Sequence, residues 1–107
     1  MPPTTTQPRP RSARRRVLEL RGELDVAAST SILKQLIQLD LRRGERLVLD
    51  LRDVDFIDST GIRLLFQARS HAERAGAAFT VVAGPPPVMR VLRLVGLDEQ
   101  LDIVDAP

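Results

Sequence analysis

Apolar residues recur along this chain with two different spacings. Four short runs have alternating or consecutive apolar side chains, as β-strands do: residues 16–24, 46–51, 78–84 and 101–105. Three longer segments repeat apolar residues every three or four positions, which predicts amphipathic helices over residues 26–43, 60–75 and 85–95. Strand and helix therefore alternate from one end to the other.

This alternation predicts an α/β fold in which helices connect parallel strands and pack on the sheet. The run 46–51 is apolar at both alternating sets of positions, which favours a buried central strand. Asp25 is expected to cap the first helix, which Gly44 should end, and Gly76 should end the second. We expect a single small domain with a mixed, mostly parallel sheet of about four to five strands.

Length and charge divide the chain into two unequal parts. The 107 residues suffice for one domain with one modest core. Residues 1–15 are rich in Pro, Thr and Arg without apolar periodicity, which predicts a disordered basic leader before a domain over 16–107. Five arginines and no acid lie in residues 1–16, so 11 basic and 14 acidic residues remain in 17–107. The overall charge of +2 therefore belongs to the leader, and the body is acidic.

Composition excludes several classes of site. The chain has no cysteine and a single histidine, His71, so thiolate and histidine-built metal sites are excluded, and we expect no metal and no cofactor. No apolar run approaches the length of a membrane span, so we expect a cytoplasmic protein without membrane contact. The basic leader lacks interleaved aromatic residues, so direct nucleic-acid binding is not expected.

A polar tetrad, Asp58 to Gly61, interrupts the apolar pattern after Phe56 and Ile57, which are expected to anchor it to the core. Residues 51–61 are predicted to form the turn from a strand's carboxyl end into a helix, where α/β proteins place ligands and modifications. Asp58 or Ser59 can serve simply as a helix cap, and Gly61 can simply allow close packing. With Asp58 as the cap, Ser59 occupies the first helical position with a free hydroxyl.

Enzymatic interpretations of the tetrad do not fit the surrounding residues. An aspartic protease has Asp followed directly by Thr or Ser and then Gly in an all-β dimer, and a phosphoaspartate receiver needs a nearby lysine, whereas the only lysine is Lys34. A serine hydrolase needs a glycine before the serine and a histidine base, and no phosphate-binding glycine loop is present. We therefore expect no catalytic residue. The remaining interpretation is a serine modified by another protein, where a phosphate beside Asp55 and Asp58 repels a partner matched to the neutral form.

Three segments resemble the STAS domain of bacterial anti-sigma factor antagonists: "GELDVAAS", "LVLDLRDVDFIDSTGIRLLFQARSHAERAGAAFTVVAG" and "VMRVLRLVGLDEQLDIV". The resemblance runs from about Val17 to Val104, and its most specific element is Asp-Ser-Ser/Thr-Gly. It implies partner switching. The unphosphorylated antagonist binds an anti-sigma factor that is an ATP-dependent serine kinase and so releases a sigma factor; phosphorylation switches it off, and a serine phosphatase reverses this.

Carried over, the resemblance makes Ser59 the phosphoacceptor and gives this chain no enzymatic activity of its own. The partner-binding residues expected around Ser59 are Asp25, Asp55, Asp58, Thr60, Gly61 and Arg63. The chain is expected to be a monomer or a weak homodimer. The alternative is a non-enzymatic STAS adaptor subunit of a lipid-transport or stress-signalling complex.

Overall fold

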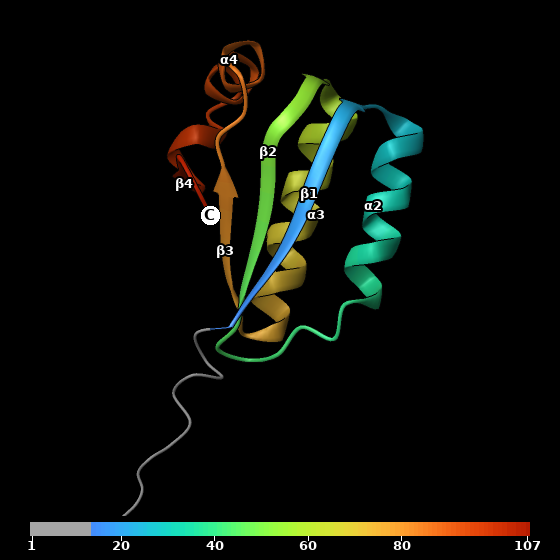
Figure 1. Cartoon of the computed structure of the whole chain (residues 1–107), viewed down its shortest axis with the longest axis vertical. Helices are drawn as coiled ribbons and strands as arrows, with labels where there is room; N and C mark the ends of the chain where they lie inside the picture. The colour runs from blue at the N-terminus through green and yellow to red at the C-terminus, as the bar shows by residue number, and fades with distance from the viewer. Residues whose placement is uncertain (1–13) are drawn as a thin grey trace, which may run out of the picture.

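The computed structural model describes residues 14–107, and its strands and helices alternate as the sequence predicts (Figure 1). The strands are β1 (Arg15–Leu24), β2 (Arg46–Ile57), β3 (Ala78–Val82) and β4 (Asp102–Val104). The helices are α2 (Val26–Gln38), α3 (Ser59–Ala75), α4 (Pro86–Leu94) and the short 3₁₀ turn η2 (Leu97–Glu99).

The four described strands form one sheet in the order β1-β2-β3-β4, and every neighbouring pair is parallel. The predicted α/β class is confirmed. Helices α2 and α3 lie side by side against the sheet, whereas α4 lies beyond the carboxyl end of β3 and contacts β2 (Figure 1). The central strand β2 thus runs between β1 and β3, as its apolar sequence indicated.

The core is aliphatic and lies between the sheet and the helices. Its fully buried members include Leu24, Leu36, Leu49, Leu65 and Leu92. Each comes from a different helix or strand, so burial of these side chains holds all the main layers together.

Strand β2 is longer than the sequence pattern suggests, and the predicted turn over residues 51–61 is wrong for its first half. Two register shifts in the β1–β2 pairing, opposite Glu19/Arg21 and Gly22/Glu23, leave β2 with two more residues than β1 over the paired stretch. Across these bulges the buried residues of β2 are Leu51, Val54 and Ile57, with two exposed residues between each pair. A three-residue repeat in a strand hides the alternation that identifies strands from sequence.

Helix α2 ends at Gln38, five residues before the predicted end at Arg43. Leu39 leaves the helix in extended conformation, with ψ of 126°, and both Leu39 and Leu41 pack against the core as partly buried residues. Gly44, predicted to stop the helix, instead has a φ of 86° in the turn before β2. Leu39 and Leu41 pack against the core in a non-helical segment, so α2 ends before Arg42 and Arg43.

The other boundaries agree closely with the sequence. Gly76 caps α3 with a left-handed φ of 75°, and Pro86 opens α4. The predicted leader, residues 1–15, lies outside the described residues except at its end, where Arg15 already belongs to β1. Among residues 14–107, no helix is both long enough and apolar enough to cross a membrane.

Candidate functional site

Two helices begin side by side at the carboxyl edge of the sheet. Leu24 at the end of β1 pairs with Ile57 at the end of β2. The residues that follow these strands, Asp25 and Asp58, cap α2 and α3 respectively. The Asp25 carboxylate accepts a hydrogen bond from the Ala28 amide at 2.9 Å. Asp25 thus lies at the same edge of the sheet as the tetrad, and its contact with a partner remains a prediction.

Asp58 holds the first turn of α3. Its Oδ1 accepts hydrogen bonds from the backbone amides of Thr60 at 2.9 Å and Gly61 at 3.3 Å. Ser59 is consequently the first helical residue, exposed to solvent, and its hydroxyl forms no hydrogen bond with any described residue. The cap thus accounts for Asp58 and leaves Ser59 available.

Gly61 is buried and allows α3 to approach the two strand ends. A Cβ at this position would lie 2.6 Å from Ile57 Cγ1, 3.0 Å from Leu24 Cβ and 3.2 Å from the Leu24 carbonyl oxygen. Distances this short require a neighbour to move. Gly61 therefore shapes the edge from within, and its role in partner contact remains a prediction.

The remaining predicted partner residues surround Ser59 at different depths. Thr60 is half-buried, and Arg63 is exposed one helical turn along α3. Asp55 is exposed in the bulged part of β2, where it borders a small hollow between the end of β2 and α4. The structure thus gathers Asp25, Asp58 and Thr60 near Ser59, whereas Asp55 faces α4.

Two apolar residues at this edge were missed as site residues. Phe56 was expected to anchor the tetrad to the core, but 51% of its surface is exposed, while Ile57 is buried as expected. Val26, directly after the Asp25 cap, is 66% exposed. The bulge before Phe56 turns this side chain to solvent. Val26 did have a sequence signal, since it stands at the first helical position outside the apolar stripe.

Ser59 presents an accessible hydroxyl at this edge, far from the histidine of the chain. The one histidine, His71, lies twelve residues along α3, about 18 Å from Ser59 at the rise of an α-helix. Within residues 14–107, no group of three or more His, Cys, Asp or Glu side chains is placed to bind a metal ion.

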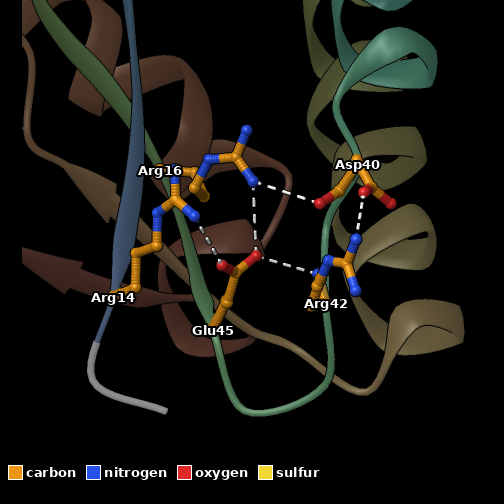
Figure 2. A network of polar contacts seen from close by, with 5 residues as sticks. All are labelled: Arg14, Arg16, Asp40, Arg42 and Glu45. Carbon is orange, nitrogen blue, oxygen red and sulfur yellow. Dashed lines mark hydrogen bonds and ion pairs between the residues drawn. The ribbon is translucent and has the colours of Figure 1, made fainter. Parts of the chain in front are cut away.

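A second polar cluster lies at the opposite end of β2 and is structural. Figure 2 shows the Glu45 carboxylate bound by Arg14 and Arg16 at the start of β1 and by Arg42 in the loop after α2. It accepts a hydrogen bond from the Arg42 amide at 2.8 Å, pairs with Arg16 at 3.3 Å and lies 3.7 Å from Arg14. The Arg42 amide, followed by Arg16, lowers the pKa of Glu45 below its ordinary value.

Asp50, a buried carboxylate within β2, pairs with the exposed Arg52. Its carboxylate accepts hydrogen bonds from two side-chain nitrogens of Arg52, at distances from 2.8 to 3.2 Å, and from the Arg52 backbone amide at 3.0 Å. These hydrogen bonds from the Arg52 side chain, then its amide, lower the pKa of Asp50. Both ionised carboxylates thus stabilise strand geometry away from Ser59.

Comparison with known proteins places these features in one family. The family model of the STAS domain matches residues 2–106. The chain is 30% identical over 90 residues to an anti-sigma F factor antagonist of Paenibacillus polymyxa, covering 83% of this chain and 77% of that protein.

Solved structures of two such antagonists share the fold. An anti-sigma factor antagonist from Mycobacterium paratuberculosis superposes with a TM-score of 0.73 at 26% identity, covering 86% of this chain and 78% of that one. The antagonist SpoIIAA in its unphosphorylated form gives a TM-score of 0.69 at 21% identity, covering 85% and 80%. The family match, the curated relative and the common fold agree with one another, and the chain therefore belongs to the STAS-domain anti-sigma factor antagonist family.

Proposed function

We propose that this protein is an anti-sigma factor antagonist that works by partner switching at Ser59. In its unphosphorylated form it binds an anti-sigma factor with serine kinase activity, and the sigma factor is released. The kinase transfers a phosphoryl group from ATP to Ser59, which ends the complex, and a phosphatase restores the binding form. The chain supplies the surface and the acceptor hydroxyl, acts in the cytoplasm and catalyses no reaction.

The observation that supports this proposal most directly is the state of Ser59. Its side chain is exposed at the first position of α3, and its hydroxyl is free of hydrogen bonds with the described residues. Thr60, the neighbouring hydroxyl, is half-buried. A kinase active site can therefore reach the Ser59 oxygen without any unfolding of the helix.

The surroundings of Ser59 explain how a phosphate would act. A phosphoserine adds about −1.5 to −2 charge at pH 7. The amides of Thr60 and Gly61 are already engaged by Asp58, so they are not free to neutralise the new charge. With Asp25 capping the adjacent helix, the edge becomes strongly anionic, and a partner that fits the neutral form is repelled.

The apolar residues at the edge support a protein partner. Phe56, next to the last residue of β2, and Val26, the first residue of α2, are both more than half exposed. Apolar side chains surrounded by polar groups are typical of protein interfaces. A new dianion among them would lose its hydration on binding, which adds to the repulsion.

The switch has a definite energetic requirement. Changing a complex from 99% bound to 99% free takes about 5.5 kcal/mol of differential affinity. Charge repulsion and lost hydrogen bonds at a partly desolvated interface are effects of several kcal/mol. A local modification can therefore drive the switch while the fold stays unchanged.

The test is site-mapped phosphorylation. The purified chain is incubated with ATP and an anti-sigma factor kinase from the same genome, and intact mass and fragment spectra are recorded. We expect a single phosphate on Ser59 that disappears in Ser59→Ala and persists in Thr60→Ala and Ser70→Ala. Ser70 is a suitable control because it is an exposed serine on the same helix. Stable binding of a partner with no phosphate on any residue would favour the adaptor function.

A further inference from the structure

A groove of about 450 Å³ lies between α2 and α3 and extends along α3 from Arg63, one helical turn from Ser59, to Arg74. Leu33 and Ile37 of α2 form one wall. The other wall is one face of α3, whose contributing residues are Arg63, Phe66, Gln67, Ser70, His71 and Arg74. These positions follow the three- and four-residue spacing of a single helical face, so the groove extends for three turns, about 16 Å.

The middle of the groove is apolar and open. Ile37 is 65% exposed and Phe66 is 41% exposed, from facing helices. Leu33 continues the same surface toward the core, against which it packs. Exposed large apolar side chains gathered in one concavity are characteristic of binding sites.

The two ends of the groove are cationic. Arg63 and Arg74 stand eleven residues apart on α3, and neither forms an ion pair with a residue in 14–107. No aspartate or glutamate lines the groove. The Nε2 atom of His71, which also lines it, is buried and has no hydrogen-bond partner among the described residues. A ligand with apolar groups in the middle and carboxylates at both ends complements this arrangement.

We propose that the groove between α2 and α3 binds an acidic amphipathic helix of a partner protein. Apolar side chains on one face of that helix contact Ile37 and Phe66, and carboxylates about three turns apart pair with Arg63 and Arg74. A compact anionic ligand needs converging cations, whereas these two stand at opposite ends. An anionic membrane needs a protruding apolar surface, whereas this one is hollow. The proposal does not depend on phosphorylation of Ser59, although Arg63 belongs both to the groove and to the residues predicted to contact a partner around Ser59.

The test is a titration of the ¹⁵N-labelled full chain with a synthetic helical peptide, followed by NMR chemical shifts. The peptide carries leucines at i and i+4 and glutamates three turns apart; a control peptide has lysines in place of the glutamates. We expect saturable shifts in the amides of residues 33–37 and 63–74 with the acidic peptide only.

Variants assign the contacts. Ile37→Ser and Arg74→Glu should each weaken binding about tenfold or more, the scale of a contact worth about 1.4 kcal/mol. Leu94→Ser and Arg93→Glu on α4 make the same chemical changes at exposed positions and should leave binding unchanged.

Four outcomes would overturn the proposal: equal binding of the lysine peptide, shifts located outside the groove, no saturable binding, or groove shifts produced instead by phosphatidylserine vesicles. Concentration-dependent self-association that Ile37→Ser abolishes would likewise assign the groove to a second copy of this chain. No measurement here involves phosphorylated Ser59, so failure of this proposal leaves the partner switch untouched.

Discussion

At the scale of single residues, the members of the tetrad Asp58-Ser59-Thr60-Gly61 differ in their contacts and exposure. Asp58 caps α3 through two amides, Gly61 brings the helix against the strand ends, and Ser59 remains exposed between them. The cap and the exposed serine follow from the preferences of Asp and Ser at helix starts. The exposure of Phe56 does not follow from its residue type, because it depends on a bulge that arises only when β1 and β2 pair.

Gly61→Ala should lower the free energy of unfolding by about 1–3 kcal/mol, the usual cost of overpacking. Alanine is favoured over glycine by up to about 1 kcal/mol in a helix, so the predicted sign is opposite to helix propensity. The cause is the 2.6 Å approach of the new Cβ to Ile57. Urea denaturation measures the change, with Ser59→Ala, an exposed position in the same turn, as the control. Equal or greater stability of Gly61→Ala would refute the close-packing role.

At the scale of secondary-structure elements, β2 determines where the site lies. Its two extra residues relative to β1 carry the strand on to Ile57, so the turn into α3 occurs directly at Asp58. Approximate strand and helix positions were predictable from apolar spacing, since the helices bury one face and the first part of β2 is buried on both faces. The bulges were not, because they arise from pairing with β1 and replace alternation by a three-residue repeat. The early end of α2 likewise depends on the packing of Leu39 and Leu41.

Arg52→Ala should destabilise the protein by about 1–3 kcal/mol, because it leaves the Asp50 carboxylate buried without its charged partner. The Asp50 side chain is only 5% exposed. Arg21→Ala removes a comparable pair with Glu19 in which both side chains are more than half exposed, and should change stability by less than about 1 kcal/mol. Chemical denaturation of both variants gives the comparison. Similar losses in the two would show that burial of Asp50 does not matter.

At the scale of the whole molecule, the two ends of the sheet carry different kinds of residues. One end carries Ser59 and exposed apolar side chains, and the other is fastened by Glu45, which joins the start of β1, the loop after α2 and the start of β2 (Figure 2). A mostly parallel sheet with helix connections could be predicted from sequence because strands and helices alternate, whereas the order of the strands was not predicted. The Glu45 cluster could not, since Arg16 lies 29 residues before Glu45 and the cluster matches no recognisable motif. The groove between α2 and α3 also escaped prediction, because Ile37 and Phe66 belong to apolar stripes expected to be buried.

Stability should fall in acid through Glu45 and Asp50. The folded state lowers the pKa of both carboxyls, so the unfolded chain binds protons first as the pH decreases. Their contribution is complete above the ordinary carboxyl range and is lost as the pH falls through the lowered folded values. Unfolding free energies measured between about pH 7 and about pH 3 should therefore decline. The decline should be shallower in Glu45→Gln and Asp50→Asn, whereas Asp105→Asn, an exposed C-terminal control, should follow the wild type. An unchanged slope in the first two variants would contradict the assignment.

The most direct test of the partner switch is the affinity of the anti-sigma factor kinase for the two forms of this protein. Chain phosphorylated stoichiometrically on Ser59 and unmodified chain are compared by isothermal titration calorimetry, with Thr60→Ala as the control. The account predicts a loss of affinity approaching 10⁴-fold, roughly the factor that a nearly complete switch requires. Affinities within a fewfold of each other would contradict it.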